Sequence, residues 1–263
     1  MPFASSVVAA RTARRRTTPL ILGTAAISAA LVIVAAAPAT AAPTHVAARP
    51  VASTPHAASG KVLLKDNFTS VPAGRTLTDG DPVGSNWHVR YAGFGSVIAT
   101  NHPALRLTPA VSKRQNETHA ALVTTNRSFG DIDATVSMRT DAQLRKGSAP
   151  NPWEAAWLLW HYTDDNHFYS LVLKPNGWEL GKEDPAYPGS QRYLATGNVP
   201  VFPTGAWYKV RVRQVGPSMT VWVNGKQLVS FTDKQRPYAS GHLGLYNEDA
   251  QTSFTGIEVQ RVP

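Results

Sequence analysis

Apolar and polar residues alternate with a period of two along most of the chain after residue 62. In residues 131–139, apolar side chains take every second position between acidic, hydroxyl and basic ones, and residues 209–213 and 219–223 repeat the pattern. Such alternation is typical of strands with one buried face. Gly, Pro, Asn and Asp separate the runs, and no helical period is evident. The pattern predicts an all-β fold, a two-sheet antiparallel β-sandwich of about a dozen strands.

Two short segments predict turns between strands. Asn224-Gly225 separates two alternating runs, and both residues readily adopt the positive φ that a type I′ hairpin turn requires. Asp164-Asp165-Asn166 also lies between two runs, and such side chains bond to their own backbone in turns. A calcium site that includes Asp164 is the alternative, because hard oxygen ligands cluster in such loops.

The N-terminal segment has the pattern of an export signal. Residues 11–16 hold four arginines, residues 19–37 are largely apolar, and residues 39–41 are Ala-Thr-Ala, which fits the small-residue pattern that signal peptidase cleaves. We therefore expect a signal peptide over residues 1–41 and a secreted, extracellular protein. An uncleaved signal anchor is the alternative, and the export route, Sec or twin-arginine, stays open.

Composition refines this organisation. Residues 42–60 are rich in Ala, Pro, Thr, Ser and His without periodicity, which predicts a disordered linker before a domain over residues 61–263. Cysteine is absent, which excludes disulfides, thiolate metal sites and a Cys nucleophile. The net charge is +9, but four of the arginines lie in the leader and the remaining cations are scattered, so we expect no nucleic-acid partner. We expect a monomer with no membrane span in the mature chain.

The order of these segments resembles a known family. The stretch WLLWHYTDDNHFYSLVL is followed by GWEL, WYKVRV, the hairpin TVWVNGKQLVSFTD, GHLGLYNEDA and SFTGIEV. With Lys65-Asp66-Asn67-Phe68 at the start and Trp87 after it, this order resembles the concanavalin A-like lectin/glucanase superfamily, in its laminin-G-like and 3-keto-disaccharide-hydrolase-type (family 16-like) branch. The resemblance implies a concanavalin-like jelly roll with one concave sheet that often holds a saccharide. It also implies Asp66 as a candidate for a structural calcium ion; no other cofactor is expected.

Strand parity then divides the side chains between core and open face. Leu158, Trp160 and Tyr162 are predicted to face the core, which leaves Trp157 and His161 on the opposite face. The same argument places Tyr169, Leu171, Leu173, Trp178 and Leu180 in the core. Sugars stack on aromatic rings and bond to charged groups, so the predicted carbohydrate-binding residues are Trp157, His161, Lys174, Glu179, Glu183 and Arg139. Packing or solvation of each of these side chains is the alternative, and a register shift at one strand would invert its assignments.

The catalytic candidates are His161, Glu179 and Arg139. Glu179 and Glu183 would lie about 13 Å apart on one strand, too far to act as the two carboxylates of a glycosidase. The Glu-x-Asp-x-x-Glu run of jelly-roll glucanases is absent from the chain. A polysaccharide lyase would need a base and a cation, which His161, Tyr162, Arg139 and Lys174 can supply by residue type.

Three classes of function remain open. The first is a secreted protein that binds extracellular polysaccharide or oligosaccharide without turnover. The second is an enzyme, either a glycoside hydrolase of the 3-keto-disaccharide type or a polysaccharide lyase. The third is a non-catalytic, laminin-G-like adhesion domain that binds protein.

Overall fold

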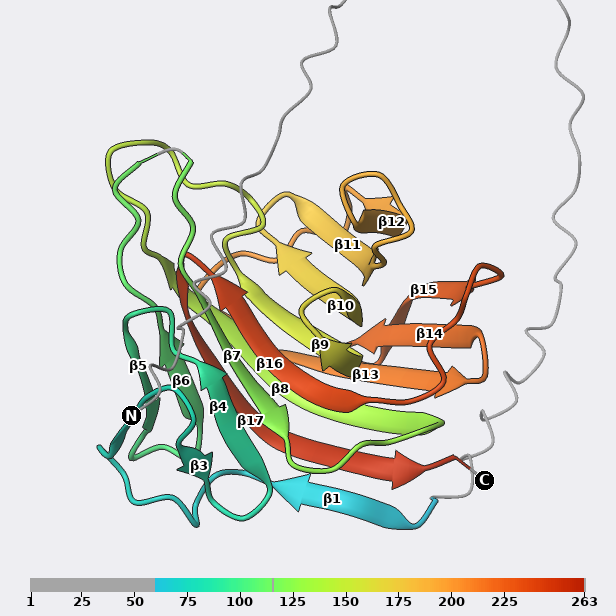
Figure 1. Ribbon diagram of the computed structural model, residues 1–263, viewed down its shortest axis with the longest axis horizontal. Helices are drawn as coiled ribbons and strands as arrows, with labels where there is room; N and C mark the ends of the chain where they lie inside the picture. The colour runs from blue at the N-terminus through green and yellow to red at the C-terminus, as the bar shows by residue number, and fades with distance from the viewer. Residues whose placement is uncertain (1–59, 115, 263) are drawn as a thin grey trace, which may run out of the picture. The chain divides into compact units, whose positions relative to one another are not determined.

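The computed structural model describes residues 60–114 and 116–262, and every regular element within them is a β-strand. The strands form two antiparallel sheets that pack face to face (Figure 1). This is the predicted two-sheet β-sandwich. The expected signal peptide (residues 1–41) and all but the last residue of the expected linker (residues 42–60) lie outside the described residues. Within the described part of the chain, no helix is long and apolar enough to cross a membrane.

Sheet A contains nine strands in the order β15-β14-β13-β8-β17-β6-β5-β2, and β1 also pairs with β17. The long strand β17 pairs with β8 along one edge and with β6 and β1 along the other, and Figure 1 shows β1 beside β17 at the bottom of the view. The strands of sheet A are β1 (Val62–Asp66), β2 (Thr76–Leu77), β5 (Ser96–Ala99), β6 (Leu105–Thr108), β8 (Ile132–Gln143), β13 (Tyr208–Val215), β14 (Ser218–Val223), β15 (Lys226–Thr232) and β17 (Ala250–Arg261).

Sheet B contains eight strands in the order β12-β11-β10-β9-β16-β7-β4-β3. Its middle is the antiparallel run from β11 to β7, which includes the segment with the most aromatic residues. The strands of sheet B are β3 (Pro82–Val83), β4 (Trp87–Tyr91), β7 (Ala120–Thr125), β9 (Ala156–Asp164), β10 (His167–Lys174), β11 (Gly177–Glu183), β12 (Gln191–Gly197) and β16 (His242–Glu248).

The hydrophobic core lies between the two sheets and follows the predicted alternation. In β8, Ile132, Ala134, Val136 and Met138 are buried and their neighbours are less so. The predicted core residues of β9, β10 and β11 are also buried in this core, with one exception described below: Leu158, Trp160, Tyr169, Leu171, Leu173, Trp178 and Leu180. Burial of these side chains provides the main favourable free energy of folding.

The exception is Tyr162, because the parity of β9 changes at His161. His161 has a φ of 50°, and the register of β9 shifts against both β10 and β16 at this point. The extra residue of such a bulge reverses the faces of the residues that follow it. The prediction was therefore wrong for both residues: Tyr162 packs on the outer face of sheet B, and His161 leaves that face.

Both predicted turns are present. Asn224 and Gly225 have φ values of 50° and 79°, as a type I′ turn requires, and they join β14 to β15. Asp165 and Asn166 join β9 to β10, and the Asp164 carboxylate accepts a hydrogen bond of 2.8 Å from the Asn166 amide.

Candidate functional site

The candidate site is the outer face of sheet B, the face turned away from the sandwich core. Paired residues on neighbouring strands point to the same face, so the registers define rows of side chains across it. One row contains Glu179, Val172, Trp157, Tyr246 and Leu122. The next row contains Tyr193, Gly181, Ser170, Leu159, Gly244 and Thr124.

The four apolar residues of the first row, Val172, Trp157, Tyr246 and Leu122, pack together, and we call them the apolar floor. Trp157 and Tyr246 meet edge to face with ring centroids 5.4 Å apart, and the Trp157 indole N–H donates to the Trp153 carbonyl oxygen at 2.9 Å. Trp157 is only 6% exposed. Such a ring offers little free surface for a pyranose to stack on. This floor supports the site rather than forming its contact surface.

The second row is lined by small residues beside one exposed aromatic. Tyr193 is 56% exposed and pairs with Gly181 on β11. A Cβ atom at Gly181 would lie 2.7 Å from the Ser170 Oγ atom, closer than real contacts allow. Glycine here leaves a strip of small side chains on β10 and β11 beside the Tyr193 ring, and this ring is an accessible aromatic surface on the face.

The Tyr193 hydroxyl lies in an acidic environment. Its partial burial raises the pKa of this hydroxyl, and three carboxylates raise it further: Glu179, Glu248 and Glu183. Glu248 lies on β16, with three strands between it and Tyr193 on β12. The Tyr193 ring and the Glu248 carboxylate therefore come to this face from strands that are not neighbours.

Polar groups surround the small-residue row. Glu179 forms an ion pair with Lys174, and the Glu248 carboxylate accepts a hydrogen bond of 2.8 Å from the Tyr246 hydroxyl. Arg90 on β4 donates to Thr124 at 3.1 Å and lies 5.9 Å from the centre of the Tyr162 ring. These carboxylates and cations are suited to bind saccharide hydroxyls in pairs.

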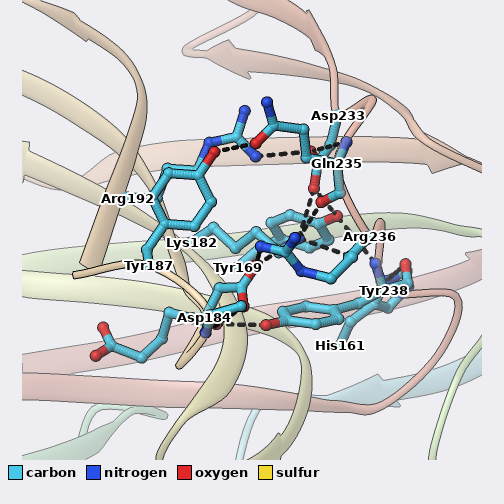
Figure 2. Close-up of polar contacts among 12 residues, drawn as sticks. His161, Tyr169, Lys182, Asp184, Tyr187, Arg192, Asp233, Gln235, Arg236 and Tyr238 are labelled. Atoms are coloured by element: carbon cyan, nitrogen blue, oxygen red, sulfur yellow. Dashed lines mark hydrogen bonds and ion pairs between the residues drawn. The ribbon is translucent and has the colours of Figure 1, made fainter. Parts of the chain in front are cut away.

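A buried network at one end of the face fixes the position of β12 (Figure 2). The Lys182 ammonium is buried and donates to Asp233 at 2.8 Å and to the carbonyl oxygens of Gln235 and Arg236 at 2.8 and 2.6 Å. Arg192, next to Tyr193, forms an ion pair of 3.0 Å with the same Asp233. The network thus ties the strand that carries Tyr193 to the loop after β15.

A second buried network lies beside the C-terminal end of β16. Arg145 forms ion pairs with Glu154 and Asp249 and donates to the carbonyl oxygens of Arg114 and Glu117 at 2.7 and 2.9 Å. Asp249 follows Glu248 directly. The network therefore holds the Glu248 end of the face in place.

Comparison with known proteins places this geometry in a family. The family model of the 3-keto-alpha-glucoside-1,2-lyase-like domain matches residues 74–260, which span both sheets. The chain belongs to this family. No curated protein matches it.

Two solved structures that share this fold have low sequence identity to this family member. A carbohydrate-binding module, CBM66 from Bacillus subtilis, matches with a TM-score of 0.51 and 12% identity over 66% of this chain and 95% of that one. A Bacillus subtilis protein of unknown function with a galectin-like fold matches with a TM-score of 0.53 and 12% identity, over 77% and 96% of the two chains. At these identities the comparison establishes the fold alone, a sandwich shared with carbohydrate-binding proteins.

In this member of the 3-keto-alpha-glucoside-1,2-lyase-like family, the predicted site residues separate into two groups. Trp157, Lys174, Glu179 and Glu183 share the outer face of sheet B, as parity predicted. Arg139 does not: it lies on β8 of sheet A, paired with Ser253. The prediction grouped Arg139 with Trp157 on one face, whereas β8 pairs with β13 and β17 in the other sheet. The roles of these residues in binding stay predictions.

His161 is also absent from the face. Its two ring nitrogens lie 2.8 Å from the Tyr238 carbonyl oxygen and 2.9 Å from the Gly130 carbonyl oxygen, and the side chain is buried. The lyase grouping of His161 with Tyr162, Arg139 and Lys174 is therefore not assembled. Burial and the neighbouring Asp165 also raise the pKa of Tyr162, which makes it a poor base at neutral pH.

The two calcium candidates serve as hydrogen-bond acceptors. Asp66 accepts from the Trp87 indole N–H and the Asn86 side-chain amide, each at 3.2 Å, and Asp164 bonds to the turn and to His167. Among the described residues, no three His, Cys, Asp or Glu side chains are placed to hold a metal ion. The calcium site therefore stays a prediction without geometric support.

Sequence reasoning missed Tyr193, Glu248 and Arg90. The signal for Tyr193 was the alternation of Gln191 and Tyr193 with Arg192 and Leu194, but its face depends on pairing with β11 across a bulge. Glu248 and Arg90 come from strands whose place in the sheet the sequence alone does not reveal.

Proposed function

We propose that this chain is a secreted saccharide-binding protein that holds an extracellular polysaccharide or oligosaccharide on the outer face of sheet B. The observation that carries the proposal is Tyr193, an exposed ring beside the small residues Gly181 and Ser170, on the face that also carries Glu179. A pyranose presents C–H groups that stack on an aromatic ring and hydroxyls that bond to carboxylates. Family membership and the shared fold support the same ligand class.

Hydrolysis by paired carboxylates is less well supported. Glu179 and Glu183 lie four residues apart on β11, a separation of about 13 Å that exceeds both glycosidase geometries. Glu183 is also buried. Binding without turnover is therefore the leading proposal.

A glycan-array screen of the purified chain tests the proposal, with Tyr193→Ala and Trp222→Ala beside it. Trp222 lies on β14 of sheet A, away from the site, so it controls for loss of an aromatic residue. We expect a saccharide ligand whose affinity falls by about 1–3 kcal/mol, or at least about fivefold, in Tyr193→Ala only. Equal loss in both variants, or binding of proteins but of no glycan, would contradict the proposal.

Elimination on a 3-keto-glucoside is the second candidate, favoured by the family to which the chain belongs. The carbonyl acidifies the C2 proton; a base removes it, the C1–O bond breaks, and the departing alcohol takes up a proton. Glu179, beside Lys174 on the open face, is the carboxylate suited to act as the base. Mass spectrometry of a 3-keto-glucoside incubated with the chain tests this. We expect unsaturated product that Glu179→Gln abolishes; no product from the unsubstituted chain would exclude turnover of this substrate.

A further inference from the structure

A hollow of about 320 Å³ lies on the outer face of sheet A, the opposite side of the sandwich from Tyr193. It is lined by Thr100, His102, Ala104, Arg106, Arg139, Trp207 and Ser253. A second hollow of about 310 Å³ continues it and shares Thr100, His102 and Arg106. Sites for small molecules occupy about 300–1,000 Å³, so the pair has room for a short oligosaccharide. We call it the Arg106–Trp207 hollow.

The surrounding protein only partly satisfies the Arg106 guanidinium group, which forms a long ion pair with Asp141. Its Nε atom is buried and, within the described residues, has no hydrogen-bond partner. The nearest carboxylate, Asp141, lies 3.8 Å away. One Asp141 oxygen already accepts from Arg139 and the other from the Ser253 hydroxyl at 2.6 Å. Two guanidinium groups thus share one carboxylate, which leaves positive charge at the hollow for an anionic ligand to compensate.

Trp207 provides an apolar surface beside this charge. It belongs to the loop before β13, is 39% exposed, and has the Arg139 guanidinium carbon 4.7 Å from its ring centroid. Arg139 therefore stacks on part of the indole, and the rest is open. A ring next to an only partly satisfied guanidinium suits a ligand that carries both C–H groups and a negative charge.

A second arginine–tryptophan pair on the same sheet shows what a satisfied arrangement looks like. The Arg211 guanidinium lies 4.9 Å from the Trp222 ring, much as Arg139 lies on Trp207. Arg211, however, binds both oxygens of Asp133, so its charge is compensated by the protein. The comparison indicates that stacking alone does not distinguish the hollow, whereas the only partly satisfied Arg106 does.

We propose that the Arg106–Trp207 hollow is a second binding site, selective for a saccharide that bears a carboxylate, a uronate residue. The carboxylate pairs with Arg106, and the sugar ring packs on Trp207. The Ser253 and Thr100 hydroxyl groups line the same hollow. Their hydrogens are donated to Asp141 and to backbone carbonyl oxygens, so their oxygens are left to accept hydrogen bonds from ring hydroxyls. This site is independent of the face proposed above, because it lies on the other sheet and differs in charge.

Titration of the purified chain with a galacturonate trisaccharide, and separately with its methyl ester, tests the proposal. The ester keeps the ring and loses the charge. We expect the acid to bind at least about tenfold more tightly than the ester, because Arg106, which shares Asp141 with Arg139, gains an anion of its own. We also expect this affinity to fall with added salt. Trp207→Ala and Arg106→Gln should each weaken binding of the acid by at least about tenfold.

Trp222→Ala and Tyr193→Ala are the matched controls, and both should leave binding of the acid unchanged. Thermal melting of each variant verifies folding. Because Trp207 lies in a loop, we expect Trp207→Ala to fold, and it tests the proposal even if Arg106→Gln unfolds. Equal affinity for acid and ester, or no binding of the acid, would overturn the proposal. Loss of binding in Tyr193→Ala with retention in Trp207→Ala would also overturn it and would move the uronate to the outer face of sheet B.

Discussion

Trp157 and Trp160 lie three residues apart on β9 and serve different faces of the same sheet. Trp160 has no exposed surface, stacks on Tyr169 with centroids 5.7 Å apart, and donates from its indole N–H to Gln214 at 2.6 Å. Trp157 packs on the other side, among the aromatic side chains of the apolar floor. Both rings therefore stabilise the fold, and Tyr193 is left as the aromatic contact surface of the outer face of sheet B.

The variant Trp160→Ala measures how much the buried Trp160 side chain contributes to the stability of the fold. Trp160→Ala should lower the free energy of unfolding by about 3–5 kcal/mol, because it leaves a large cavity and an unpaired Gln214. Trp222→Ala, on the outer face of sheet A, should cost about 1 kcal/mol or less. Urea denaturation of the two variants gives the comparison; similar losses for both would show that Trp160 does not occupy the core.

For single residues, the sequence predicted some positions correctly and others wrongly. Period-two alternation correctly assigned Trp160 to the core and Glu179 to the outer face, because parity depends only on local backbone geometry. It failed for His161 and Tyr162, where one extra residue at a bulge reverses parity. It also did not reveal that Trp157 would be covered by its neighbours, which depends on side chains from other strands such as Tyr246.

At the scale of elements, buried charges hold the ends of the outer face of sheet B. Burial alone would raise the pKa of Asp233, but hydrogen bonds from Lys182, the Gln235 amide and Tyr169 outweigh it and hold the pKa below its usual value. The folded state then binds fewer protons than the unfolded state at mildly acidic pH. The stabilisation by Asp233 is therefore fully present above the unfolded pKa of about 3.9 and is lost as pH falls through the lower folded pKa.

The pH dependence of Asp233→Asn tests this network. The variant should be less stable than the unsubstituted chain by an amount that is constant above about pH 5 and shrinks below about pH 4. Asp133→Asn is the control, since its pair with Arg211 is partly exposed and should contribute at most about 1 kcal/mol. Urea midpoints between pH 3 and pH 7 provide the measurement. A difference that grows toward acid pH would contradict the assignment.

The order of the strands within the two sheets was not predicted from the sequence. The hairpin at Asn224-Gly225 and the turn after Asp164 follow from local chemistry. The partners of β8 and β12 depend on contacts between segments far apart in the chain. That is why Arg139 was assigned to the wrong sheet and Tyr193 was not recognised.

At the scale of the whole molecule, the two proposed saccharide sites lie on opposite sheets of one sandwich. The outer face of sheet B offers Tyr193 with carboxylates, and the Arg106–Trp207 hollow offers an aromatic with only partly satisfied positive charge. One chain with two such sites can contact two sugars of different charge. Two linked contacts raise the overall affinity for a polymer above that of either site.

Export of the chain is a proposal that rests on residues 1–41. Cleavage after Ala41 should give a mature protein that begins at Ala42, because Ala39 and Ala41 meet the small-residue requirement of signal peptidase. N-terminal sequencing of protein recovered from the medium tests this directly. Retention of the full-length chain in the membrane would show that the apolar run is an anchor instead.

Amide chemical-shift mapping by NMR, during titration with a saccharide selected on the array, tests the proposed saccharide-binding face most directly. Binding at the outer face of sheet B should shift the amides of Gly181, Tyr193 and Glu179 and leave the neighbours of Trp222 unchanged, because ring contacts at Tyr193 perturb β11 and β12 first. Shifts that are confined to sheet A, with none on β10–β12, would contradict the assignment of this face as the saccharide-binding site.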